Sequence, residues 1–150
     1  MNLLIPPPIV ALICAFLIWI ISGNVNVLSF QFGGQQVLAY TIMAIGLCID
    51  VVSVALFFKS KTTVTPLSPQ KTSKLVVSGL YRFTRNPMYL GLAFLLTGWA
   101  IYCGNIIGFS AILLFVFYIT KFQILPEEAV LIEKFGNEYE QYQSRVRRWI

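Results

Sequence analysis

Residues 88–103 read MYLGLAFLLTGWAIYC and residues 106–125 read IIGFSAILLFVFYITKFQIL, with only Gly104 and Asn105 between them. Spanning a bilayer takes roughly 20 apolar residues, and both runs are close to that length. A turn of two residues forces two such helices to run antiparallel. The stretch therefore predicts a transmembrane hairpin, in which Lys121 is the one charged residue and can extend its stem to the interface.

Two further apolar segments precede the hairpin, over residues 3–21 and 37–58. Pro6, Pro7 and Pro8 suit the entry turn of the first, since proline is tolerated at the start of a helix. No basic region precedes that segment, so we expect a retained helix rather than a cleaved signal. With 57% hydrophobic and 11% charged residues, the chain is too apolar for a soluble domain. We predict an all-α integral membrane protein of four transmembrane helices, forming a single domain over residues 1–150.

The charges are distributed unequally between the connections. Residues 22–36 carry no charge, whereas the loop over residues 59–87 carries basic residues and no acidic one. The positive-inside rule places this loop in the cytoplasm, and an even number of spans then places both termini there too. Attraction to anionic lipid also accounts for such a loop. The basic residues are Lys59, Lys61, Lys71, Lys74, Arg82 and Arg85, with Arg145, Arg147 and Arg148 near the C-terminus.

An amphipathic helix is predicted over residues 127–148. Apolar side chains recur there at alternating steps of three and four, which is the period of one helix face. Gly136 and Asn137 interrupt the pattern and indicate a bend. We expect this helix to lie against the cytoplasmic face of the bundle or on the membrane surface. The stripe consists of Ile132, Phe135, Tyr139, Tyr142, Val146 and Trp149.

Most of the polar chemistry lies in two motifs, GLYRFTRNPMYLG over residues 79–91 and PEEAVLIEKFGNEYEQYQSRV over residues 126–146. The hairpin brings them to the same cytoplasmic end, where we predict a pocket roofed by residues 74–89 and closed by Glu127 and Glu128. Paired carboxylates beside a basic, aromatic segment suit a zwitterionic or cationic ligand. Alternatively, the dipole of a helix starting after Pro126 favours acidic residues in its first turn. The absence of histidine excludes histidine catalysis and ligation, and we predict no metal site.

The order G-x-Y-x-x-x-R-N-P-x-Y-x-G, hydrophobic hairpin, E-E-x-x-L-x-x-x-F-G-x-x-Y-x-x-Y resembles the isoprenylcysteine carboxyl methyltransferase family, over roughly residues 71–148. Its relatives include the membrane phospholipid methyltransferases. The resemblance implies S-adenosylmethionine as methyl donor, bound on the cytoplasmic side. It also implies a lipid-like or small acceptor that enters from the bilayer of what we expect to be a prokaryotic cell membrane. No nucleic-acid partner is expected.

Carried over residue by residue, the resemblance assigns a set of residues to the donor. Where the family has R-H-P, this chain has Asn86, which can donate and accept hydrogen bonds but cannot titrate. The eukaryotic enzymes place an arginine before the acidic pair to meet the acceptor carboxylate, and Gln123 stands there, so Lys121 is the candidate for acceptor contact. Glu128 and Arg85 are the candidate catalytic residues. The donor set is Lys74, Leu75, Val76, Tyr81, Asn86, Pro87, Met88, Tyr89 and Glu127.

Asp50 keeps two other interpretations open. It is the one acidic residue within the first two predicted spans, and a charge in hydrocarbon needs a partner or a water-filled cavity. A four-span subunit of a proton-coupled transporter could use it as the coupling acid. A non-catalytic membrane scaffold, presenting its C-terminal helix to a partner, is a third hypothesis. The transporter hypothesis leaves both polar motifs unexplained.

Overall fold

The computed structural model describes residues 5–59 and 75–150, and within them the chain is helical. No strand occurs in these ranges; Ser29 and Asn105 form an isolated bridge. The prediction of an all-helical chain is thereby confirmed. The elements are α1 (Pro7–Asn24), α2 (Gln35–Lys59), a 3₁₀ turn η2 (Gly79–Arg82), α3 (Pro87–Cys103), a 3₁₀ turn η3 (Ile106–Phe109), α4 (Ser110–Ile119), a π-helical turn η4 (Thr120–Ile124), α5 (Leu125–Phe135) and α6 (Asn137–Arg145).

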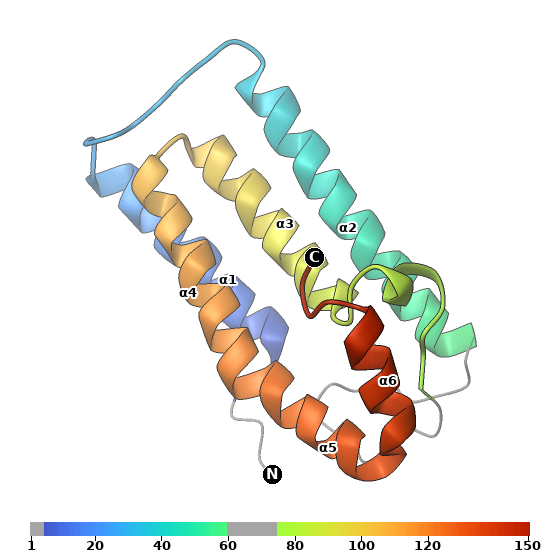
Figure 1. The fold of residues 1–150 in the computed structure, drawn as a ribbon. Helices are drawn as coiled ribbons and strands as arrows, with labels where there is room; N and C mark the ends of the chain where they lie inside the picture. Colours follow the sequence, from blue (N-terminus) through green and yellow to red (C-terminus); the bar gives the residue numbers. More distant parts are fainter. Residues whose placement is uncertain (1–4, 60–74) are drawn as a thin grey trace.

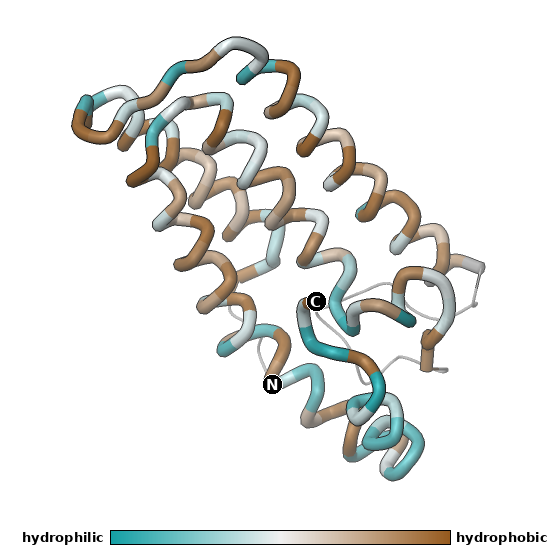
Figure 2. Tube along the Cα trace, turned by 45° about the horizontal axis from the view of Figure 1, so that its top comes forward, coloured by the Kyte–Doolittle hydropathy of each residue, from teal (hydrophilic) through white to brown (hydrophobic). Residues whose placement is uncertain are grey.

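Figure 1 shows α3 between α2 on one side and α1 with α4 on the other. The α1–α2 connection lies at one end of the bundle and α5 and α6 lie at the opposite end, while the C-terminus returns to a place beside α3. Hydrophobic residues cover the long helices, whereas hydrophilic ones gather around α5 and α6 (Figure 2). The stretches Pro7–Asn24, Gln35–Leu56 and Ile106–Phe135 are long and apolar enough to cross a membrane, while Pro87–Cys103 is shorter. The chain is thus a multi-pass membrane protein.

Small residues let α2 and α3 pack closely. A Cβ added at Gly91 would lie 2.0 Å from Oδ1 of Asp50 and 2.8 Å from the carbonyl oxygen of Gly46. A Cβ at Gly98 would lie 2.7 Å from the carbonyl oxygen of Ala39. In lipid, helices associate through van der Waals packing, so glycine at the contact lets the two backbones approach. This contact fixes the start of α3, which carries the first polar motif.

The turn of the predicted hairpin is anchored to the connection between α1 and α2. Gly104 adopts a left-handed conformation with φ 69°, and its carbonyl accepts a hydrogen bond from the Phe30 amide at 2.8 Å. The Asn105 side chain is fully buried. Its Nδ2 donates to the Val25 carbonyl at 2.5 Å, and its Oδ1 accepts from the Ile107 amide at 2.8 Å. One side chain therefore ties the hairpin turn to the end of α1.

Asn105→Ala is expected to destabilise the protein by about 2 kcal/mol, because it removes both hydrogen bonds of a buried side chain and leaves the partly buried Val25 carbonyl without its donor. Thermal unfolding in mild detergent, followed by tryptophan fluorescence, measures the change. Asn137→Ala is the matched control, since Asn137 is exposed. Equal midpoints for the two variants would contradict the anchoring role.

The second helix of the hairpin continues beyond its predicted end. Residues 106–135 form one helical stretch that passes through Pro126 without a break. Proline has no amide hydrogen to donate, and the wider η4 turn accommodates it, with the Leu125 amide donating to the Thr120 carbonyl five residues back. Glu127 and Glu128 consequently lie inside a helix, so no new helix N-terminus stabilises them.

The C-terminal region also differs from the predicted single helix over residues 127–148. The predicted bend is confirmed: α5 ends at Phe135, Gly136 takes φ 51°, and α6 starts at Asn137. After α6, residues 146–150 leave the helix and return toward the start of α3; we call this segment the C-terminal strap. In Figure 1 the strap, in dark red, reaches back between α6 and α3.

Candidate functional site

The hairpin brings the two polar motifs into direct contact, as the sequence predicts. The Oη of Tyr89, at the start of α3, donates to Oε1 of Glu127 in α5 at 2.7 Å, across 38 residues of sequence. Gln123 Nε2, one helical turn before Glu127, donates to the same oxygen. Within the described residues none of these hydrogen bonds ends on Oε2 of Glu127. This oxygen can accept from a ligand.

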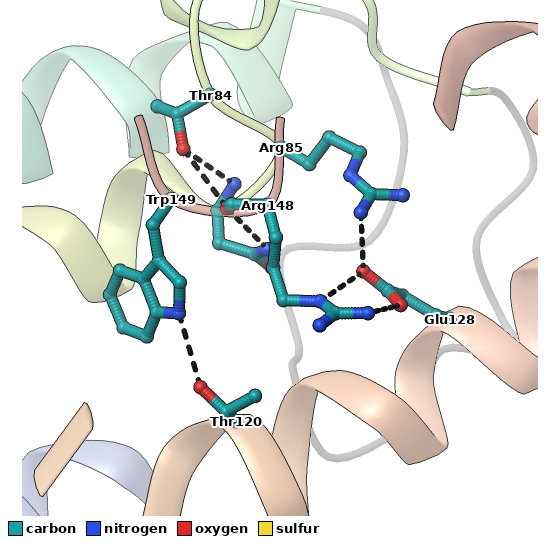
Figure 3. A network of polar contacts seen from close by, with 7 residues as sticks. Thr84, Arg85, Thr120, Glu128, Arg148 and Trp149 are labelled. Atoms are coloured by element: carbon teal, nitrogen blue, oxygen red, sulfur yellow. Dashed lines mark hydrogen bonds and ion pairs between the residues drawn. The ribbon is translucent and has the colours of Figure 1, made fainter. Parts of the chain in front are cut away.

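Glu128 is held by two arginines. Arg148 Nε and Nη2 donate to its two oxygens at 3.0 Å and 2.8 Å, a bidentate contact, and Arg85 Nη2 lies 3.2 Å from Oε1 (Figure 3). The Glu128 and Arg85 side chains are 8% and 9% exposed, while Arg148 is 34% exposed. The hydrogen bond to Glu128 raises the pKa of Arg148. The two adjacent carboxylates thus have different environments.

The C-terminal strap crosses the first motif and reaches η4. Thr84 Oγ1 and Asn86 Nδ2 donate to the carbonyl of Arg148 at 3.2 Å and 3.0 Å. The Arg85 amide donates to the Arg147 carbonyl at 3.0 Å, and Trp149 Nε1 donates to Thr120 Oγ1 at 3.1 Å. Figure 3 shows the contacts of Thr84 with Arg148 and of Trp149 with Thr120, beside the Glu128 ion pairs. Sequence reasoning missed the strap, and its one local signal was the basic, aromatic ending R-V-R-R-W.

Three tyrosines pack η2 against α6. Tyr142 Oη donates to the carbonyl of Tyr81 at 2.7 Å, and both Tyr81 and Tyr139 are buried. Burial raises the pKa of Tyr139 to about 12, and burial likewise raises the pKa of Tyr81 and of Tyr142 above the ordinary phenol value. These phenols stay protonated at neutral pH. They can donate hydrogen bonds or present a ring face, but they do not supply a base.

The other predicted site residues lie in three regions: the segment before η2, the first turn of α3, and the π-helical turn η4. Val76 is buried and Leu75 partly buried, just before η2, while Lys74 lies outside the described residues. Pro87 is buried in the first turn of α3, and Met88 is partly buried beside it. Lys121 is exposed, and its Nζ lies 5.7 Å and 5.5 Å from the ring centroids of Phe117 and Phe122.

A groove of about 410 Å³ lies between the segment before α3 and α6. It adjoins Tyr142, the tyrosine that bonds to the backbone of Tyr81. Its walls combine apolar and charged side chains, a mixture that suits a ligand with both a flat and a polar part. The residues lining it are Leu75, Val77, Arg82, Glu138, Gln141, Tyr142, Arg145 and Val146.

Comparison with known proteins identifies related sequences. The model of the phospholipid methyltransferase family matches residues 35–138. This range includes α2, the hairpin and the adjacent carboxylates Glu127 and Glu128. An uncharacterized protein of Haemophilus influenzae is 41% identical over 63 residues, which are 42% of this chain and all of that protein. A protein-S-isoprenylcysteine O-methyltransferase of Schizosaccharomyces pombe is 30% identical over 122 residues, 79% of this chain. The match spans 50% of that yeast protein. No solved structure matches the chain.

Proposed function

We propose, because this chain belongs to the phospholipid methyltransferase family, that it transfers a methyl group from S-adenosylmethionine to a lipid-like or small acceptor at the membrane surface. The observation that carries this proposal is the contact between Tyr89 and Glu127, which joins the two motifs into one site. The yeast relative is named an O-methyltransferase, which favours an oxygen of the acceptor as the methylated atom.

The residues of the site fit the chemistry of the donor. S-adenosylmethionine combines a sulfonium, an ammonium, a carboxylate and a flat base. We propose that Oε2 of Glu127 accepts from the ammonium or the ribose, while Tyr81 and Tyr89 present ring faces to the cation or the base. The groove beside Leu75 and Tyr142 offers space for the base. The full proposed donor set is Lys74, Leu75, Val76, Tyr81, Asn86, Pro87, Met88, Tyr89 and Glu127.

The mechanism places few demands on acid and base groups. When bound, the donor would supply a methyl group activated by its sulfonium. An acceptor oxygen would attack the methyl carbon in line as the carbon–sulfur bond breaks and S-adenosylhomocysteine leaves, so the protein must mainly align the reactants and exclude water. Tyr89 and Gln123 fix the orientation of Glu127 for this task. Both oxygens of Glu128 already accept from Arg148, so removing a proton from an acceptor would require displacing that arginine. A carboxylate acceptor needs no such step, and it therefore fits the site better than an amine or a thiol.

We propose the predicted membrane arrangement together with this activity. In this arrangement the chain crosses the membrane four times, with α3 as the shortest span. Both termini and the α5–α6 end then lie in the cytoplasm, where the donor is found. The whole chain then forms a single methyltransferase domain. We keep Lys121 as a proposed acceptor contact, because its exposed position at the end of the fourth span suits a ligand entering from the lipid.

The two other hypotheses receive less support. Asp50 packs against Gly91, and its Oδ1 is buried without a hydrogen bond from the described residues, but family membership does not favour a transporter. The C-terminal helix α6 contacts its own chain through Tyr139 and Tyr142 rather than presenting that face to a partner.

Calorimetric titration of the protein in lipid nanodiscs tests the proposal directly. We expect S-adenosylmethionine and S-adenosylhomocysteine to bind saturably, with dissociation constants of roughly 1 to 100 µM. ATP, which shares the adenosine but lacks the methionyl part, is the control and is expected not to bind in this range. A folded sample that binds neither sulfur compound would overturn the proposal.

A further inference from the structure

Arg85 has more hydrogen-bond donors than the described residues satisfy. Its side chain is 9% exposed, so it is more than nine-tenths buried. Nη2 contacts Glu128 at 3.2 Å, whereas Nε and Nη1 are buried and have no hydrogen-bond partner within residues 5–59 and 75–150. Figure 3 shows one end of the guanidinium directed at Glu128 and the other end nitrogen directed away from it. Burying a guanidinium whose Nε and Nη1 make no hydrogen bond raises the free energy of the folded protein. We therefore take these two donors as an indication that a ligand completes the site.

The charges around Arg85 define the ligand that fits there. Arg85 and Arg148 together carry two positive charges against the one of Glu128, so this cluster retains a single positive charge. Glu127 immediately precedes Glu128 in α5, and Tyr139, a neutral phenol, faces the same charges from α6. A group with one negative charge balances the cluster, whereas a doubly charged phosphate would add repulsion from two neighbouring carboxylates. Carboxylate oxygens also match guanidinium donors in geometry.

We propose that Arg85 forms a carboxylate-binding subsite of the methyl-transfer site, an inference that rests on the proposed function. Two ligands can supply the carboxylate: the methionyl part of the donor and an acidic acceptor. The donor fits well, because an α-amino acid could place its ammonium at Oε2 of Glu127 and its carboxylate at Arg85. Arg148 differs from Arg85, since its Nε and Nη2 are both engaged by Glu128 and it is more exposed. Arg148 therefore holds the strap, and Arg85 is left to bind the ligand.

Pairs of ligands that differ only in the carboxylate test this subsite. S-adenosylhomocysteine is compared with its decarboxylated analogue by calorimetry in nanodiscs, and 5′-methylthioadenosine serves as a ligand without either amino acid group. We expect the wild type to prefer S-adenosylhomocysteine over the decarboxylated analogue by roughly tenfold, the usual worth of a hydrogen bond to a charged group. Arg85→Gln is expected to abolish the preference while its affinity for 5′-methylthioadenosine is unchanged.

Further variants separate binding from folding. Arg147→Gln removes the same charge from an exposed side chain and is expected to keep the preference. Arg148→Gln is expected to loosen the strap, measured as faster tryptic cleavage after Arg147, and to reduce the preference without abolishing it, because the cluster loses one positive charge while the Arg85 donors remain. If Arg85→Gln does not fold, Arg85→Lys retains the charge but lacks the planar fork, and we expect an intermediate preference.

A second pair distinguishes the acceptor as the source of the carboxylate. N-acetyl-S-farnesylcysteine and its carboxamide are titrated into the protein saturated with S-adenosylhomocysteine. Discrimination within either pair that Arg85→Gln abolishes supports the subsite, and the pair identifies the source. The subsite would be overturned if Arg85→Gln still bound the carboxylate-bearing ligand more tightly than its partner. It would also be overturned if the wild type bound both members of each pair equally well. A folded wild type that binds no S-adenosylhomocysteine at all would instead reject the proposed function.

Discussion

Glu127→Gln is expected to weaken the binding of S-adenosylmethionine at least about 100-fold, because we propose that Glu127 pairs with the ammonium of the donor, and removing one charge from such a pair costs several kcal/mol. Glutamine keeps an oxygen that can accept from Tyr89 and Gln123, so the local geometry survives while the negative charge is lost. If Glu127 binds the cationic part of the donor, only the affinity should suffer. Calorimetry in nanodiscs measures the affinity, and thermal unfolding shows whether the fold is retained.

Glu133→Gln is the matched control for this change. Glu133 lies on the same helix and is exposed, so the substitution alters the net charge by the same amount away from the site. We expect wild-type affinity from this control. A folded Glu127→Gln protein that binds the donor as tightly as Glu133→Gln would remove Glu127 from the donor site and, with it, the central contact of the proposed pocket.

The hairpin could be predicted because its determinants are local. Two apolar runs joined by Gly104 and Asn105 permit one arrangement, and that arrangement alone places the motif at Tyr89 beside the motif at Glu127. The bend at Gly136 was predictable for the same reason, since glycine readily adopts a positive φ. Features determined by neighbouring residues and by hydrophobic period were thus accessible from sequence.

Pro126 misled the prediction because proline usually marks a helix start. In the structure the helix instead continues through Pro126, and the π-helical turn before this proline explains how the helix can accommodate it.

The close packing of α2 on α3 had a visible signal that sequence reasoning did not use. Gly91 and Gly98 are seven residues apart, as are Ala39 and Gly46, and such a spacing keeps small residues on one face of each helix.

The contacts of the C-terminal strap could not be predicted, because they join residues far apart in the chain. Arg148 meets Glu128 across 20 residues and receives hydrogen bonds from Thr84 and Asn86 across more than 60. Charge alone identified Arg148 as one of several basic residues that favour a cytoplasmic terminus. Nothing in its neighbours distinguishes it from Arg147, whose side chain is exposed.

Glu128→Ala is expected to destabilise the protein by about 3 to 5 kcal/mol, because it leaves Arg85 buried without its carboxylate. The strap should detach as well, since Arg148 loses both of its side-chain hydrogen bonds and can turn toward water. Thermal unfolding in mild detergent measures the first effect. Tryptic cleavage after Arg147 and Arg148, followed by mass spectrometry, measures the second. Glu140→Ala, at an exposed position in α6, is the control and should change neither.

A double variant shows whether the lost stability comes from the uncompensated charge. Glu128→Met combined with Arg85→Met replaces the ion pair with apolar side chains of similar length, and buried pairs often tolerate such replacement. We expect this protein to recover most of the stability that Glu128→Ala loses, while the strap remains open to trypsin because Arg148 still lacks its partner. Glu127 and Glu128 would then differ sharply in role, one governing ligand affinity and the other stability. A Glu128→Ala protein as stable as the wild type, with a protected strap, would show that the backbone contacts of Arg148 and the Trp149 hydrogen bond hold the segment without the ion pairs.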